Sequence, residues 1–158
     1  MAVYAIADLH LPARQKPMDV FGEHWRDHFQ RISEDWRARV APDDLVLLPG
    51  DLSWAMRLEE AVEDLNSIAA LPGTTLLLRG NHDYWWATAA KLHRFFEEKG
   101  IKSLDILHNS CISYGEYAVC GTRGWFLEEE QKPHNAKVLA REVGRLETSL
   151  QAAGGRPI

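Results

Sequence analysis

The sequence predicts an α/β fold whose first part is a largely parallel sheet. Three short apolar segments, at residues 3–7, 45–48 and 74–78, alternate with helical patterns, and such alternation is typical of β-α-β units. The chain has 158 residues, of which 46% are apolar and 26% are charged, as in ordinary globular proteins. This length favours one domain, so we predict a single domain over residues 1-158.

The first part of the chain contains two predicted strands and one predicted helix. Val3–Ala7 is an apolar run that ends in Asp8, which predicts a buried strand. Leu11–Gly22 contains two prolines and is predicted as a loop. In Glu23–Val40 the large apolar residues recur every three or four positions, which predicts an amphipathic helix. Leu45–Leu48 is the second predicted strand.

The middle of the chain repeats this alternation. Glu59–Leu71 has helical spacing of its apolar residues and ends at a Pro-Gly pair. Thr74–Leu78 predicts the third strand. Thr88–Lys99 predicts a further helix, which we expect Gly100 to end because glycine readily adopts the left-handed conformation of a helix C-cap.

The last part of the chain predicts a meander followed by a helix. The meander consists of the short strands Ile106–Leu107, Cys111–Tyr114 and Tyr117–Cys120, which are separated by turn residues. The acidic run Glu128–Glu130 is predicted to be solvated, and Asn135–Ala152 predicts the last helix.

Composition excludes several classes of protein. Lys and Arg number 18 against 23 Asp and Glu, which gives a formal net charge of −5. A net negative charge disfavours nucleic acid as a partner. No apolar run approaches the roughly 20 residues of a membrane span, and no signal peptide is visible at the start. Cys111 and Cys120 form no CxxC pair, so we expect thiols in a reducing, cytoplasmic compartment.

Polar side chains follow each of the three predicted strands in the first part of the chain. The carboxyl ends of parallel strands line one crevice, so these side chains are expected to converge. Carboxylate, imidazole and amide ligands suit Mn²⁺, Fe or Zn²⁺. Alone, Asp8 could cap a strand and Asn81 could occupy a turn, but the ordered set predicts a metal site. Its three segments are Asp8-Leu9-His10, Gly50-Asp51 and Gly80-Asn81-His82-Asp83.

These segments resemble the first three motifs of the calcineurin-like metallophosphoesterase superfamily, over roughly residues 1–125. The resemblance implies a layered α-β-β-α sandwich and two divalent metal ions, Mn, Fe or Zn. It implies that Asp8 and His10 hold one metal, that Asp51 bridges both, and that Asn81 binds the second. By the same resemblance, His82 is the catalytic residue and acts on the leaving group or the phosphate.

This ligand set supports hydrolysis of a small phosphomonoester or phosphodiester. Two cations roughly 3.5–4 Å apart can share a hydroxide that attacks the phosphorus in line. His82 could protonate the departing alkoxide, because imidazole titrates near neutral pH. The alternative function is a non-catalytic metal-binding or interaction module that retains the fold.

The sequence departs from the family pattern in two ways. Many members have an Asp-Arg pair shortly after the second motif, whereas here Asp51 is followed by Leu-Ser-Trp-Ala, which leaves Asp83 as a possible substitute for the carboxylate that orients the catalytic histidine. The later Gly-His-x-His motif also has no match, and we interpret His108 and His134 as solvent or turn histidines. We therefore expect a fold incomplete at its C-terminus, with an open sheet face that favours self-association.

Two further features allow either a functional or a structural interpretation. The aromatic residues Trp54 and Tyr84-Trp85-Trp86 directly follow two of the motifs, so they form either the rim of a substrate pocket or part of the core. Arg123 follows a predicted strand and either contacts a substrate phosphate or lies on the surface.

Overall fold

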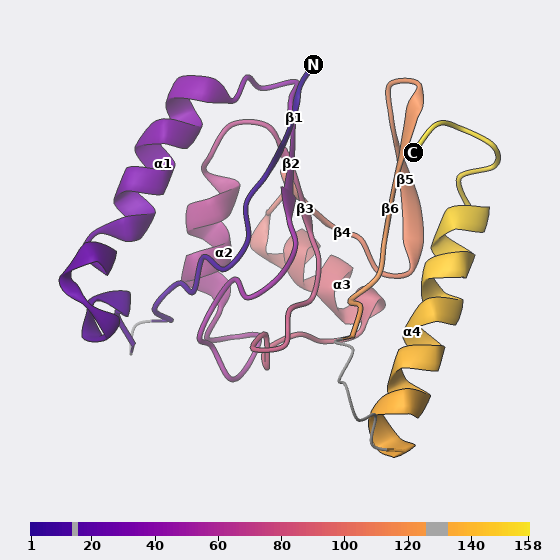
Figure 1. Cartoon of the computed structure of the whole chain (residues 1–158). Helices are drawn as coiled ribbons and strands as arrows, with labels where there is room; N and C mark the ends of the chain where they lie inside the picture. Colours follow the sequence, from indigo (N-terminus) through magenta and orange to yellow (C-terminus); the bar gives the residue numbers. More distant parts are fainter. Residues whose placement is uncertain (14–15, 126–132) are drawn as a thin grey trace. The chain divides into compact units, whose positions relative to one another are not determined.

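The computed structural model describes residues 1–13, 16–125 and 133–158, and the predicted acidic run Glu128–Glu130 lies outside them. The chain forms two compact units, Met1–Ile106 and Leu107–Ile158 (Figure 1). No helix among the described residues combines the length and the apolar character needed to cross a membrane.

A four-stranded parallel sheet forms the centre of the first unit. Its strands are β1 (Val3–Ala5), β2 (Leu45–Leu48), β3 (Thr74–Leu77) and β4 (Leu104–Ile106), and they lie side by side in that order (Figure 1). All three neighbouring pairs are parallel, which confirms the predicted parallel sheet. The predicted three-stranded meander is wrong, because its first strand belongs to this sheet as β4 and pairs with β3.

Three helices connect the strands and cover one face of the sheet. They are α1 (His28–Arg39), α2 (Val62–Ala69) and α3 (Ala89–Lys99). Strands that follow one another in sequential order place right-handed crossovers on the same side. The side chains at alternate strand positions accordingly share one buried core with residues of all three helices, among them Val46, Leu48, Leu77, Trp36, Leu65 and Leu92.

The predicted helix over Glu23–Val40 is wrong at its start. Asp27 has φ 53°, and this left-handed backbone interrupts the helix, so α1 begins at His28. The residues before it form the short 3-10 helices η1 (Met18–Phe21) and η2 (Glu23–Trp25). The apolar spacing that predicts a longer helix reflects burial and does not report the backbone conformation at Asp27.

The predicted ends of the third helix are confirmed to within one residue. Thr88 is the N-cap of α3, and its side chain accepts a hydrogen bond from the backbone N–H of Lys91 at 3.4 Å. Gly100 has φ 69° and ends the helix in the left-handed conformation.

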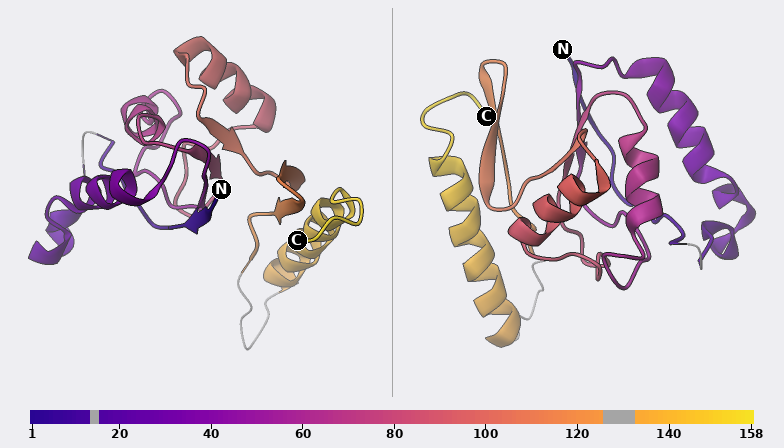
Figure 2. Two further views of the ribbon diagram at one scale, coloured as in Figure 1. Left: turned by 90° about the horizontal axis from the view of Figure 1, so that it is seen from above. Right: turned by 180° about the vertical axis from the view of Figure 1, so that it is seen from behind.

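The second unit consists of a hairpin and a long helix. Strands β5 (Ser110–Tyr114) and β6 (Tyr117–Gly121) are antiparallel, and α4 (Pro133–Gln151) runs beside them (Figure 2). Gly115 has φ 60° in the two-residue turn, a conformation that favours glycine. Cys111 lies opposite Cys120, and both cysteines are free thiols.

Candidate metal centre

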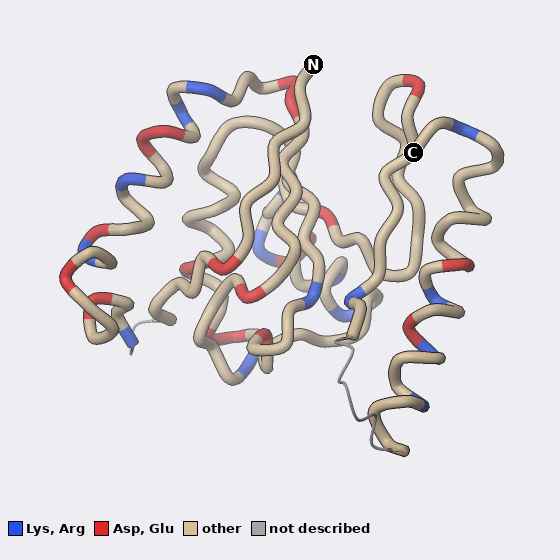
Figure 3. Tube along the Cα trace, viewed as in Figure 1, with Lys and Arg blue, Asp and Glu red and all other residues tan. Residues whose placement is uncertain are grey.

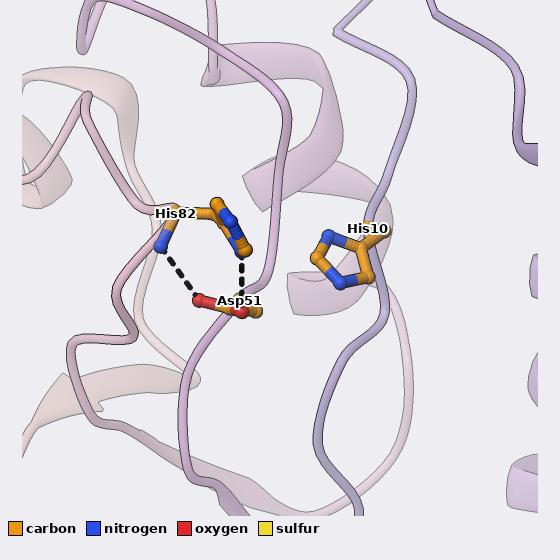
Figure 4. A group of neighbouring side chains, drawn as sticks. All are labelled: His10, Asp51 and His82. Atoms are coloured by element: carbon orange, nitrogen blue, oxygen red, sulfur yellow. Dashed lines mark hydrogen bonds and ion pairs between the residues drawn. The ribbon is translucent and has the colours of Figure 1, made fainter. Parts of the chain in front are cut away.

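The loops after β1, β2 and β3 bring His10, Asp51 and His82 together (Figure 4). One ligand atom from each of these side chains lies within 4.8 Å of the others, and the described residues contain no other such group of at least three His, Cys, Asp or Glu. Figure 3 shows acidic positions in the loops at this end of the sheet. Imidazole and carboxylate are donor groups that suit a divalent transition metal.

The backbone at this cluster is strained. Asp8, His10 and Asp51 have φ values of 58°, 44° and 53°, in the left-handed region that costs residues other than glycine on the order of 1–3 kcal/mol. Such strain gathers where the structure must aim particular side chains. Three of the predicted ligands therefore adopt backbone conformations that the sequence pattern does not reveal.

Backbone hydrogen bonds hold the β1 and β2 loops side by side beyond the ends of the strands. The N–H of Asp8 donates to the Gly50 carbonyl at 3.1 Å, and the N–H of His10 donates to the Asp51 carbonyl at 2.9 Å. From α1, His28 Nε2 donates to the carbonyl of Leu9 at 2.7 Å. The two loops thus extend the parallel pairing and fix His10 beside Asp51.

Asp64 of α2 joins the same two loops through hydrogen bonds. Its buried carboxylate, on α2, accepts hydrogen bonds from the backbone N–H of Ala13 at 3.0 Å and from the hydroxyl of Ser53 at 2.5 Å. Burial raises the pKa of Asp64 although both hydrogen bonds lower it. Sequence analysis missed this residue; its signal is a carboxylate among the buried apolar positions of α2, next to Leu65 and four residues before Ile68.

Asp83 joins the β2 loop to the β3 loop. Its side chain, of which 1% is exposed, accepts hydrogen bonds from four N–H groups. These belong to the backbone of Gly80 at 2.8 Å, Asp51 at 2.9 Å and Leu52 at 2.9 Å, and to the Trp85 indole at 3.0 Å. Burial nevertheless raises the pKa of Asp83. The Asp83 carboxylate thus binds loop backbone and the Trp85 indole, whereas the imidazole of His82 binds Asp51 instead.

Two glycines permit the close approach of these loops. A Cβ on Gly50 would lie 2.5 Å from the Cα of Gly80, and a Cβ on Gly80 would lie 2.0 Å from Oδ1 of Asp51. Gly50 also has φ 101°, which favours glycine. Gly50 and Gly80, which precede the ligands of the second and third segments, are therefore required for space, and Gly50 is also required for its backbone conformation.

His82 binds the Asp51 carboxylate twice. Its backbone N–H donates to Oδ1 and its Nδ1 donates to Oδ2, both at 2.9 Å. Burial by itself would raise the pKa of Asp51, but these hydrogen bonds and the charges of His82 and His10 lower it below its ordinary value. Asp51 is thus held as a carboxylate, the form that binds a metal.

His10 is positioned by an aromatic ring. Its imidazole stacks on Trp54 with a centroid distance of 4.6 Å and an interplanar angle of 19°. Its Nδ1 is buried and has no hydrogen-bond partner among the described residues, an arrangement that is rare for a buried polar atom. A bound cation would give this nitrogen a partner.

Asp8 and Asn81, the other predicted ligands, lie at the rim of the cluster. The Asp8 carboxylate is 65% exposed and lies 3.6 Å from Nε2 of His10. Asn81 is exposed, and its Nδ2 lies 3.2 Å from Nδ1 of His82. The His10, Asp51 and His82 cluster therefore includes the predicted catalytic histidine, while the roles of Asp8 and Asn81 stay predictions.

The aromatic residues after the motifs divide between the two interpretations. Trp85 is buried in the core and Trp86 packs against it, as the structural interpretation expects. Tyr84 is 57% exposed, and its ring meets that of His82 edge-on at 6.5 Å. Trp54 is half-buried, and its ring lies 5.7 Å from that of His82.

Three residues singled out in the sequence belong to the second unit. The guanidinium of Arg123 lies 5.0 Å from the centre of the Trp125 ring, and a contact with a substrate phosphate stays a prediction. His108 and His134 are both exposed, in agreement with their interpretation as solvent or turn histidines.

A cavity of about 510 Å³ lies between β1 and α1, and none of the three clustered residues lines it. Tyr4, Ile6, Trp25 and Ile32 are among the residues that line it. Size alone does not identify a reactive site, whereas strained backbone and converging polar groups do. The His10, Asp51 and His82 cluster is therefore the candidate metal centre.

Comparison with known proteins agrees with this geometry. The family model of the calcineurin-like phosphoesterases matches residues 1–140, which include all three loops. The chain belongs to this family. Its mixed α/β fold is accordingly of the metallophosphoesterase type, and the members of the family depend on metal ions. The donor chemistry of the cluster and the unpartnered Nδ1 of His10 fit that dependence.

A solved structure supports the fold. The chain is similar to the crystal structure of a protein of unknown function, AQ665 from Aquifex aeolicus, with a TM-score of 0.52 and 20% sequence identity. The match covers 94% of this chain and 75% of the Aquifex aeolicus chain. No curated protein matches the sequence.

Replacing Gly80 by alanine should disrupt the cluster, because the new Cβ would lie 2.0 Å from Oδ1 and 2.2 Å from the backbone nitrogen of Asp51. We expect Gly80→Ala to lower the free energy of unfolding by about 1–3 kcal/mol or more, and to weaken Mn²⁺ binding on the order of tenfold or more. Urea unfolding and calorimetry measure the two effects. Gly144→Ala in α4 is the control, since its Cβ meets no atom within 4 Å; equal effects of both changes would contradict the steric argument.

Asp64 should make stability depend on pH. Because burial raises its pKa above the ordinary value of 3.8, the folded protein holds this proton more tightly than the unfolded chain does. Stability is then lost as pH rises from that value through the folded pKa. Asp64→Asn keeps an acceptor oxygen without the charge, so wild type should lose stability relative to Asp64→Asn over this range. Urea unfolding between about pH 4 and 7 tests this, and a constant difference would contradict it.

Proposed function

We propose that the chain provides the metal centre of a phosphoesterase that hydrolyses a small phosphomonoester or phosphodiester. The observation that carries the proposal is the convergence of His10, Asp51 and His82 on strained loops in a member of a metal-dependent family. The proposed cofactor is a pair of divalent ions, Mn, Fe or Zn. When bound, they would supply Lewis acidity that activates water and neutralises charge on the phosphoryl oxygens.

Asp51 is the proposed central ligand. It is the most buried member of the cluster, with 7% of the residue exposed, and its charge is stabilised by His82 and His10. Asp8 and His10 from the β1 loop would hold one ion, and Asn81 from the β3 loop would hold the other. The buried carboxylates of Asp64 and Asp83 hold these loops through hydrogen bonds and so keep the proposed ligands in position.

His82 is the proposed proton donor or phosphate contact. Nδ1 of its ring donates to Asp51, and Nε2, which lies 3.4 Å from Nδ2 of Asn81, is the nitrogen proposed to face a substrate. Its side chain is 42% exposed, so a substrate oxygen can approach it. The carboxylate partner orients the imidazole, an arrangement that suits general acid catalysis.

Asp51→Asn should remove metal binding and activity together, because it takes away the charge of the central ligand. We expect the variant to lose bound Mn²⁺ and the hydrolysis of an aryl phosphate in the same preparation, as measured by metal analysis and a chromogenic assay. Asp35→Asn is the matched control, since Asp35 lies on α1 and pairs with Arg39 at the surface. An Asp51→Asn protein that still binds two metals would refute the assignment, and full metal loading without turnover in wild type would favour the non-catalytic module.

His82→Ala should separate metal binding from turnover. We expect kcat to fall by about 10²–10⁴, the range for loss of general acid–base catalysis, while the metal content stays close to that of wild type. His93→Ala provides the control, because His93 is an exposed histidine on α3 beside Asp105. An unchanged rate with an unactivated alkyl leaving group would show that the role given to His82 is wrong.

A further inference from the structure

A recess lies beside the metal cluster and shares a wall with it. The shared wall is Trp54, whose ring stacks on His10 at 4.6 Å. The volume of the recess is about 290 Å³, and a cavity of about 150 Å³ is enough to hold a benzene ring. The recess is lined by Pro12, Ala13, Lys16, Trp54, Met56 and Glu60.

Trp54 is a fixed wall. Besides His10, its ring contacts the ammonium of Lys16, whose Nζ lies 3.6 Å from the ring centre. Its indole N–H donates to Sδ of Met18 at 3.4 Å, and the Phe21 ring stacks near it at 6.4 Å. Because His10 and Lys16 lie against the ring and Met18 accepts its N–H, the indole is held in place as one wall of the recess.

Apolar side chains at the recess are exposed to water. Met56 is 62% exposed, and Phe21, next to the Trp54 wall, is 53% exposed. Covering such surface is favourable in proportion to the apolar area removed from water, so a ligand ring that lay against Met56 and Phe21 would gain affinity. Singly exposed hydrophobic residues are common, but these two adjoin a preformed cavity next to a reactive cluster.

The lining of the recess carries one cation and one carboxylate, Lys16 and Glu60. Lys16 is the cation in the lining, and its Nζ also lies 5.1 Å from the Phe21 ring centre. The acidic residue in the lining, Glu60, has its carboxylate engaged by the backbone N–H groups of Met56 and Arg57 at 3.0 and 3.2 Å. The Lys16 ammonium lies against the same Trp54 ring that stacks on His10, so it adds a positive charge close to a phosphate bound at the cluster. The recess beside it is lined by both apolar and charged side chains.

We propose that this recess binds the alcohol part of the phosphoester and selects substrates whose alcohol carries an apolar ring. The inference rests on the proposed function for the place of the phosphate. Phe21, Met56 and Trp54 are then specificity-determining residues, and their contribution is binding energy remote from the reacting bond, which appears mainly in affinity.

Two phosphonates test the proposal without requiring turnover. Benzylphosphonate and ethylphosphonate carry the same anionic group and differ in the ring, so the ratio of their dissociation constants reports the recess alone. With Mn²⁺ present, we expect calorimetry to show benzylphosphonate binding about tenfold more tightly to wild type, the gain that burial of one ring gives.

Met56→Ser and Phe21→Ser should each lower this ratio to about threefold or less, because Met56 lines the recess and Phe21 lies beside its Trp54 wall, so each change removes apolar surface that a ligand ring could cover. Both side chains are more than half exposed, so the variants are expected to fold, and circular dichroism checks this. Val143→Ser is the matched control, an apolar residue 50% exposed in α4, and it should leave the ratio unchanged.

The outcomes separate this inference from the proposed function. Equal affinity of wild type for the two phosphonates, or a ratio that Met56→Ser and Phe21→Ser leave intact, would each overturn the recess as a ring-binding site. No binding of either phosphonate would refute the phosphate site on which both proposals rest. A ring preference in a protein that hydrolyses no phosphoester would support the recess and refute the proposed catalysis. Hydrolysis of ethyl and benzyl phosphate with equal kcat/KM would support the catalysis and refute the recess.

Discussion

Two buried carboxylates hold the three loops that form the candidate metal centre. Asp64 binds the β1 loop at Ala13 and the β2 loop at Ser53. Asp83 binds the β2 loop at Asp51 and Leu52 and the β3 loop at Gly80. Each loop is thereby fixed to its neighbour through charge-assisted hydrogen bonds, which are stronger than neutral ones.

This arrangement is energetically costly, and the cost indicates its purpose. Burying a carboxylate is unfavourable unless hydrogen bonds compensate for lost hydration, and burial indeed raises the pKa of both Asp64 and Asp83. The left-handed backbone at Asp8, His10 and Asp51 adds strain. A fold optimised for stability alone would avoid both costs. Their coincidence in adjoining loops is typical of a site where side-chain positions matter for function.

The surroundings of His82 differ from the pattern that the family resemblance leads one to expect. The carboxylate beside the imidazole is Asp51 itself, while Trp54 and Tyr84 place aromatic rings at 5.7 and 6.5 Å from the ring of His82. Aromatic rings beside a site proposed to bind phosphate favour a ligand that is charged at one end and apolar at the other. The recess beside Trp54 extends this character away from the cluster.

The sequence predicted the parallel sheet and the convergence of polar side chains from three strand ends, and three of the five predicted side chains, His10, Asp51 and His82, form the cluster while Asp8 and Asn81 lie at its rim. Apolar runs and helical spacing report local burial, and burial follows the strands and helices closely enough to place His10, Asp51 and His82 at neighbouring strand ends. Tertiary structure decided the rest. Local pattern did not show that α1 begins only at His28, since the left-handed turn at Asp27 leaves no periodic signal. It also did not show the bond from Ala13 to Asp64, across 51 positions, or that from Asp51 to Asp83, across 32. Hydrogen bonds between residues so distant in sequence depend on the packed positions of several elements at once, and that is why only the folded chain specifies how the metal centre is held.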